Sequence, residues 1–160
     1  MATIYISIGS NINPTQNIQY ALDDLKQTFG KLSCSTHYES KSVGFDGDNF
    51  INLVASAETE FDILAVADHL HSIEDQHGRD RSGPKFSSRT LDLDLLLYDA
   101  EVFEQGKLKI PRDEILFNAF VLRPLAELAP TLKHPIEKKM YAELWQAFDQ
   151  SLQALWPVEE

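Results

Sequence analysis

The chain has 160 residues, of which 43% are hydrophobic and 24% are charged, and its single cysteine excludes an internal disulfide bond. The formal net charge of −11 argues against nucleic acid as a main partner, because nucleic-acid-binding proteins usually carry a basic face. The N-terminus lacks a basic leader, and no apolar run approaches the roughly 20 residues that cross a bilayer. We therefore expect one cytoplasmic domain over residues 1–160 that does not bind membranes.

Hydrophobic periodicity predicts the elements in chain order. Ile4, Ile6 and Ile8 alternate with other residues as in a strand, whereas the apolar residues after Pro14 recur at helical spacing. The predicted elements are a strand ending at Gly9, a helix over residues 14–29, strands over 32–39 and 50–57 separated by a polar loop, a helix from Asp62 to near Gly78, and a strand through Asp92 and Asp94. This β-α-β-β-α-β order predicts an α+β fold of the ferredoxin-like type, with helices packed on an antiparallel sheet.

Additions to this core are expected at the C-terminus, as a hairpin over residues 99–110 and helices over 118–129 and 137–149. Pro124 weakens the prediction for the first of these helices, because proline removes an interior hydrogen bond. Cys34 falls in a predicted strand, where a cysteine is usually buried. The inner face of the helix that begins at Asp62 is predicted to consist of Leu64, Ala67, Leu70, His71 and Glu74.

Residues 78–98 carry the strongest functional signal. Asp92 and Asp94 are two apart on a predicted strand, so both carboxylates point to the same face of the sheet. Two like charges at this separation repel each other, and a divalent cation such as Mg²⁺, which binds carboxylate and phosphate oxygens, would relieve the repulsion. The loop that precedes the strand supplies four cations, Arg79, Arg81, Lys85 and Arg89. The stretch indicates a site for a metal ion and a nucleotide.

On these residues alone, simpler interpretations stay open. Alternating Asp and Leu are also typical of an exposed edge strand, and a cationic loop can be solvated and paired with surface acids. Phe50 and Phe120 would by default be core residues.

Five segments along almost the whole chain carry a resemblance. They are Ile8-Gly9-Ser10-Asn11, Asn52, residues 74–81, the run Arg89-Thr-Leu-Asp92-Leu-Asp94, and Pro111 with Phe120-Val-Leu-Arg-Pro-Leu-Ala-Glu-Leu-Ala-Pro130. Together they resemble the 6-hydroxymethyl-7,8-dihydropterin pyrophosphokinase family of folate biosynthesis. The resemblance implies a diphosphotransferase that moves the β,γ-diphosphoryl group of ATP to the hydroxymethyl oxygen of the pterin, giving AMP. It also implies two Mg²⁺ ions bound with ATP, and we expect the enzyme to be a monomer.

Matching positions to the family pattern implies a role for individual residues. Asp92 and Asp94 would bind the metal and, with Arg79 and Arg89, act in catalysis. ATP would be bound by Glu74, Arg79, Arg81, Arg89, Lys107, Lys109 and Arg112. The pterin would be bound by Ser40, Val43, Gly44, Phe50, Asn52, Phe86 and Phe120. These residue types suit the roles, since guanidinium groups donate paired hydrogen bonds to phosphate and aromatic faces stack on flat rings.

The chain departs from the family pattern at Phe86, Arg112 and Asn118, where the family usually has Trp, His and Arg. These departures bear on turnover rate and on the identity of the pterin rather than on metal or ATP binding. Two alternatives therefore stay open: a paralogue that acts on a modified pterin, and a catalytically silent protein that binds a nucleotide or a pterin.

Overall fold

The computed structural model describes residues 1–41, 49–77, 91–151 and 153–158. Its elements are β1 (Ala2–Ser10), α1 (Pro14–Phe29), β2 (Ser33–Cys34), β3 (Tyr38–Ser40), β4 (Phe50–Thr59), α2 (Ile63–Gln76), β5 (Asp92–Tyr98), β6 (Phe103–Gln105), β7 (Leu108–Ile110), the 3-10 helix η1 (Asp113–Leu116), α3 (Ala119–Leu128), α4 (Tyr141–Ala147) and β8 (Leu155–Pro157). Within the described part of the chain, no helix is long and apolar enough to span a membrane.

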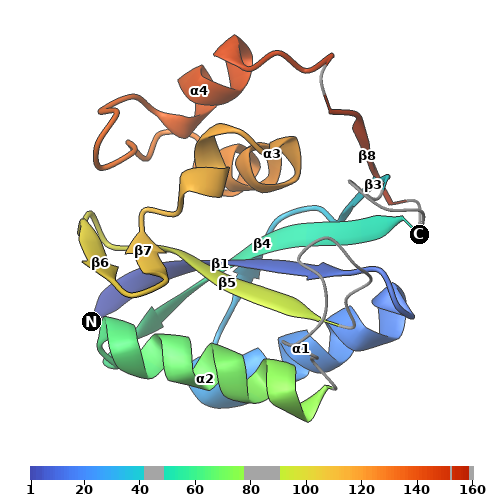
Figure 1. Ribbon diagram of the computed structural model, residues 1–160, viewed down its shortest axis with the longest axis vertical. Helices are drawn as coiled ribbons and strands as arrows, with labels where there is room; N and C mark the ends of the chain where they lie inside the picture. The colour runs from blue at the N-terminus through green and yellow to red at the C-terminus, as the bar shows by residue number, and fades with distance from the viewer. Residues whose placement is uncertain (42–48, 78–90, 152, 159–160) are drawn as a thin grey trace.

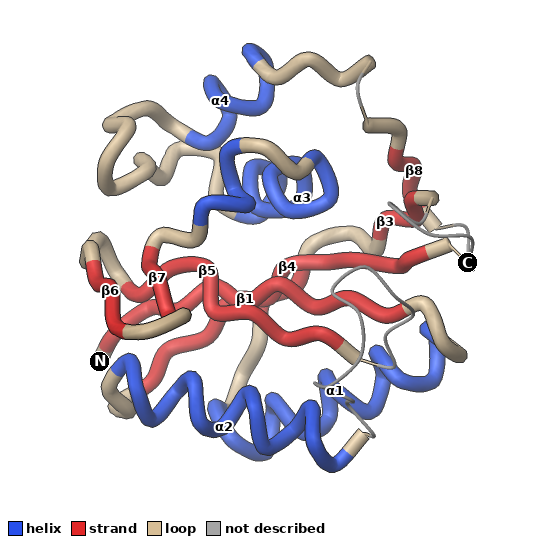
Figure 2. Tube along the Cα trace, in the orientation of Figure 1, coloured by secondary structure: helices blue, strands red, loops and turns tan. Residues whose placement is uncertain are grey.

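An antiparallel sheet forms the centre of the molecule, with helices on both faces (Figure 1). Its strand order is β5-β1-β4-β3-β8, and β2 also pairs with β4. Figure 2 shows α1 and α2 against one face and α3 and α4 on the other. The strands β5, β1, β4 and β3 lie in the order of a ferredoxin-like sheet. The predicted α+β fold is therefore confirmed. The predicted C-terminal hairpin is also present as β6 and β7.

Two apolar layers hold the sheet between the helices. Ile4, Ile6 and Ile8 of β1 are fully buried in the layer beneath α1 and α2, as their alternation predicts. On the other face, Val54 and Leu97 pack with residues of α3 and with Tyr141 of α4. β1 is therefore covered on both faces, and its C-terminal end pairs with the first residues of β4 and β5.

Three predictions about local structure are wrong. The strand expected over residues 32–39 is divided into β2 and β3, because the Ser35 hydroxyl replaces a backbone carbonyl and accepts the N–H of Val54 at 3.0 Å. Cys34 is exposed rather than buried, since β2 pairs with a neighbour on one side only. The helix expected from residue 137 begins at Tyr141, because the His134 N–H donates to the carbonyl of Lys139 and closes a turn.

The inner face of α2 is only partly as predicted. Leu70 and Glu74 are buried, whereas Leu64 and His71 are exposed and Ala67 is half-buried. The buried stripe is instead Ile63, Val66, Leu70, Ile73 and Glu74. It buries two more branched aliphatic side chains than the predicted face would, which favours this rotation of the helix.

Tyr141 offers a test of the packing beneath α4. Its ring is fully buried, and its hydroxyl is a buried polar atom for which the described residues supply no hydrogen-bond partner. Burial raises the pKa of Tyr141, and nearby Tyr5 raises it further. We expect Tyr141→Phe to leave the free energy of unfolding unchanged or raise it by up to about 1 kcal/mol, because it removes a desolvated hydroxyl. Urea denaturation measures this, and a clear loss of stability would contradict it.

Candidate active site

One face of the sheet carries five of the ten predicted site residues that the structure describes. Asp92 and Asp94 begin β5, and Leu93 and Leu95 between and after them point into the layer beneath α1 and α2. The two carboxylates therefore lie on the opposite face, as predicted. Their side chains are not enclosed: that of Asp94 is 44% exposed, so it can bind a ligand from solution.

The strand register connects the aspartates to the predicted pterin-binding residues. Gly9 of β1 pairs with Asp92 on one side and with Asn52 of β4 on the other. Phe50 lies two residues before Asn52, on the same face, and pairs with Ser40 of β3. Two strand spacings separate Asp92 from Asn52, about 10 Å. We call this arrangement the site face, made of Asp92, Asp94, Asn52, Phe50 and Ser40.

Gly9 is required where it stands because Asn52 lies against it. A β-carbon built on Gly9 would lie 2.5 Å from Oδ1 of Asn52, far inside van der Waals contact. The Asn52 side chain is buried, with 5% exposure, so it has little room to move away. The missing side chain at position 9 therefore lets the Asn52 amide lie across β1 toward the aspartates.

Glu74 of α2 supports the strand that carries the aspartates. Its carboxylate is buried, and Oε2 accepts a hydrogen bond from the N–H of Leu93 at 2.8 Å. Leu93 lies between Asp92 and Asp94 on the edge strand of the sheet, where this N–H has no neighbouring strand to bind. Glu74 thus fixes the edge strand between Asp92 and Asp94, and its contact with ATP stays a prediction.

Arg112 is a described cation that lies beside Asp94. Its Nη1 is 3.7 Å from Oδ1 of Asp94, and its Nε and Nη2 donate to the two carboxylate oxygens of Glu114 at 3.0 and 3.1 Å. Burial would lower the pKa of Arg112, but the carboxylates of Asp94 and Glu114 outweigh it and raise the pKa. The guanidinium group therefore stays charged beside Asp94, where a phosphate would need it.

The other predicted site residues are not members of the site face, or they lie outside the described residues. Lys107 is exposed in the turn between β6 and β7, and Lys109 pairs with Asp113 at 3.1 Å. Figure 1 shows this hairpin toward the end of β5 that is remote from Asp92. Phe120 is half-buried in the first turn of α3, which packs on β4. Arg79, Arg81, Arg89, Phe86, Val43 and Gly44 lie outside the described residues.

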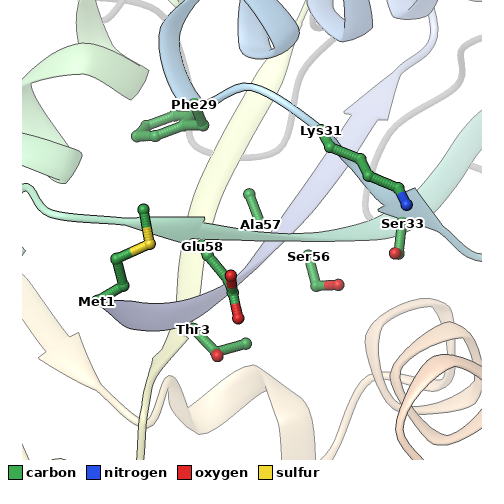
Figure 3. Close-up of a pocket in the computed structure, with 8 residues that line it drawn as sticks. All are labelled: Met1, Thr3, Phe29, Lys31, Ser33, Ser56, Ala57 and Glu58. Carbon is green, nitrogen blue, oxygen red and sulfur yellow. The ribbon is translucent and has the colours of Figure 1, made fainter.

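A surface hollow of about 440 Å³ lies at the opposite end of the sheet, where β1 begins and β4 ends. It is lined by Met1, Thr3, Phe29, Lys31, Ser33, Ser56, Ala57 and Glu58 (Figure 3). None of the predicted site residues belongs to it. Figure 3 shows Ala57 on the side of the strands toward Phe29, and Thr3 and Glu58 on the other side, so the hollow wraps around the sheet edge.

The family model for 7,8-dihydro-6-hydroxymethylpterin-pyrophosphokinase (HPPK) matches residues 5–130. The chain belongs to the HPPK family. The matched segment contains every residue predicted for the site from Ser40 to Phe120.

Relatives of similar length support the assignment to the HPPK family. The 2-amino-4-hydroxy-6-hydroxymethyldihydropteridine pyrophosphokinase of Haemophilus influenzae is 37% identical over 152 residues, which are 92% of this chain and 94% of the relative. The protein of the same name from Pseudomonas aeruginosa is 38% identical over 136 residues, which are 82% of this chain and 83% of the relative.

Solved structures of the HPPK family share the fold. A crystal structure of HPPK-DHPS in complex with substrates matches 94% of this chain with a TM-score of 0.76 at 13% sequence identity. The wild-type HPPK-DHPS of Plasmodium falciparum matches 91% with a TM-score of 0.74 at 12% identity. In both cases this chain spans 44% of the longer protein, so the match concerns one part of it.

The described residues of this HPPK chain fit a magnesium site in which two carboxylates are the protein ligands. Within residues 1–41, 49–77, 91–151 and 153–158, no three His, Cys, Asp or Glu side chains are grouped as a metal cage. Mg²⁺ typically binds one or two carboxylates and takes its other ligands from water and substrate phosphates. Asp92 and Asp94, adjacent on one face and open to solvent at Asp94, suit this mode of binding.

Sequence reasoning did not single out every residue that shapes the HPPK site. Gly9 was quoted only as part of the family motif, although its missing β-carbon makes room for Asn52. A glycine within a strand, here near the end of β1, can signal close approach of another group, and it could have indicated this contact. The inner-face position of Glu74 was predicted, but its hydrogen bond to the N–H of Leu93 joins residues 19 apart and left no local signal.

Proposed function

We propose that the protein transfers the β,γ-diphosphoryl group of ATP to the hydroxymethyl oxygen of 6-hydroxymethyl-7,8-dihydropterin, in folate biosynthesis. The products are AMP and the pterin pyrophosphate. The observation that carries the proposal is the register that places Asp92 and Asn52 on one face, about two strand spacings apart. A metal–phosphate site and a pterin site at this separation suit a reaction between ATP and a pterin.

In this reaction the hydroxymethyl oxygen attacks the β-phosphorus and loses its proton. The bond between the β-phosphorus and the oxygen bridging to the α-phosphorus breaks, and AMP leaves with the electron pair. Mg²⁺ held by Asp92 and Asp94 would neutralise the charge of the triphosphate. We assign no residue as general base, and positioning and charge neutralisation account for the mechanism.

Side chains of the site face, together with Phe120 and several arginines, are proposed to bind the pterin and the phosphates. The amide of Asn52 offers a donor and an acceptor to the edge of the pterin ring, and Phe50 and Phe120 offer aromatic faces for stacking. Arg112 would stabilise phosphate charge from its place beside Asp94. Arg79, Arg81 and Arg89 are proposed to hold phosphates on the grounds of the family pattern alone.

We further propose that the enzyme acts as a monomer in the cytoplasm. The strands β1, β3, β4 and β5 of one chain bring the residues of the site face together, which supports a monomer. The free thiol of Cys34 is exposed and is suited to a reducing compartment. Light scattering at working concentrations tests the monomer, and a stable dimer would contradict it.

The products formed from Mg-ATP with and without the pterin test the proposed function. We expect AMP to appear only with 6-hydroxymethyl-7,8-dihydropterin, in amounts equal to the pterin consumed and without ADP. Chelating the metal with EDTA should stop the reaction. Formation of ADP would contradict diphosphoryl transfer. ATP binding without AMP formation would favour a paralogue with a modified pterin or a catalytically silent binder.

A further inference from the structure

The last part of the chain connects two regions of the site that are far apart in sequence. We call residues 153–158 the C-terminal strap. Its strand β8 pairs with β3, so that Leu155 lies opposite Ser40 of the site face. The N–H of Val158 extends this pairing by donating to the carbonyl of His37. Figure 1 shows β8 beside β3 at the edge of the sheet.

Gln153, at the start of the strap, caps the helix that carries Phe120. Asn118 occupies the N-cap position of α3 but makes no capping hydrogen bond with its side chain. The Gln153 amide replaces it: Oε1 accepts from the N–H of Ala119 at 2.7 Å, and Nε2 donates to the carbonyl of Phe117 at 2.9 Å. A backbone N–H at a helix start needs such a partner. Gln153 therefore fixes the first turn of α3 directly before Phe120.

Arg123 makes a second link between α3 and the strap, one helical turn after Ala119. Its guanidinium carbon lies 4.7 Å from the centre of the Tyr38 ring on β3, and Nη1 donates to the carbonyl of Leu155 at 3.3 Å. One turn further, Oε1 of Glu127 accepts from the Tyr38 hydroxyl at 2.6 Å. Ala119, Arg123 and Glu127, spaced four residues apart along α3, thus connect this helix to β3 and to the C-terminal strap.

The Glu127 contact also orders the segment between β2 and β3. Oε2 of Glu127 accepts from the N–H and the hydroxyl of Thr36, at 3.0 and 2.8 Å. Partial burial would raise the pKa of Glu127, but the hydrogen bonds from Tyr38 and Thr36 outweigh it and lower the pKa. The carboxylate is held in its ionised, accepting form, so β3 is fastened to α3 at more than one point.

We propose that the C-terminal strap sets the spacing between the two walls of the pterin site, with Gln153 and Arg123 as positioning residues. One wall is the first turn of α3, with Phe120, and the other is the β3–β4 pair, with Ser40 and Phe50. A flat ring stacks well only when its two aromatic neighbours are held at the right separation. This inference rests on the proposed function, because it takes Phe50 and Phe120 as the pterin walls.

The test compares Gln153→Ala with Gln153→Glu, and with Gln150→Ala as a matched control that is exposed just before the strap. Gln153→Ala is expected to raise the KM for the pterin about tenfold, the loss typical of an outer-shell hydrogen-bonding partner, with the KM for ATP unchanged. Gln153→Glu should recover part of the loss, since a carboxylate still accepts from Ala119. Gln150→Ala should behave as the wild type.

The outcomes distinguish failure of the positioning role of the strap from failure of the proposed function. An unchanged pterin KM in Gln153→Ala, or equal rises in both KM values, would overturn the positioning role. If Gln153→Ala does not fold, Arg123→Lys replaces it, because an ammonium group loses the fork that reaches both Tyr38 and Leu155. The proposed function itself fails instead if the wild type forms no AMP with the pterin. The assignment of Phe120 as a wall of the pterin site fails if Phe120→Ala leaves the pterin KM unchanged.

Discussion

Replacing Asp94 by Asn is expected to lower kcat at least about 100-fold, because it removes a proposed metal ligand. Loss of a residue that only hydrogen-bonds a metal ligand already lowers metal affinity or activity about 10–100-fold. The substitution keeps the shape of the side chain and removes one carboxylate of the pair. The fold should persist, since Asp94 is 44% exposed and Arg112 keeps its two hydrogen bonds to Glu114. AMP formation at saturating substrates, measured across a Mg²⁺ titration, tests this result.

The matched control for this substitution is Asp23→Asn. Asp23 is exposed on α1, on the opposite side of the sheet, where its Oδ1 accepts from Gln19 at 3.1 Å. Asp23→Asn should turn over like the wild type, because it removes one negative charge without touching the site face. If Asp94→Asn kept wild-type kcat at every Mg²⁺ concentration, Asp94 would not be a metal ligand.

Gly9→Ala is expected to raise the KM for the pterin about tenfold, because overpacking a tight site typically costs about 1–3 kcal/mol. The new β-carbon would lie 2.5 Å from Oδ1 of Asn52, so the amide that is proposed to bind the pterin edge must shift. The KM for ATP should change little, since Asn52 lies on β4 and the aspartates lie on β5, the strand that flanks β1 on its opposite edge. Steady-state kinetics with each substrate varied in turn measures the difference.

A double-mutant cycle isolates the cause of the Gly9→Ala effect. In an Asn52→Ala background the collision is absent, so Gly9→Ala should add no further rise in the pterin KM. Gly30→Ala serves as the control for backbone strain alone, because Gly30 has φ +84° and no neighbouring atoms within 4 Å of a built β-carbon. Equal effects of Gly9→Ala in both backgrounds would show that the contact with Asn52 is not the cause.

Local sequence patterns were sufficient to predict the frame of the fold. Pro14 begins α1 as its fixed φ and missing N–H suggest, and the alternation of Ile4, Ile6 and Ile8 identifies a strand covered on the α1–α2 side. The pairing of Asp92 and Asp94 on one face follows from the two-residue period of a strand. These inferences succeed because each depends on residues close together in the chain.

Predictions that depend on distant contacts were less successful. The strand β8 was not predicted, because three residues that include a proline carry no periodicity and the strand forms only where β3 offers an open edge. The rotation of α2 was wrong at Leu64 and His71, since both helix faces contain apolar residues and the sheet decides between them. Capping of α3 by Gln153 joins positions 34 residues apart, beyond any local signal.

The measurement that most directly tests this account is a crystal structure with Mg²⁺, 6-hydroxymethyl-7,8-dihydropterin and an ATP analogue whose α and β phosphorus atoms are joined by a methylene group. That bridge replaces the bond the reaction breaks, so both substrates should remain bound. We expect metal density on Asp92 and Asp94, and the pterin ring between Phe50 and Phe120 with the Asn52 amide at its edge. A pterin bound elsewhere, for example in the hollow beside Glu58, or metal away from the aspartates would contradict the proposed site.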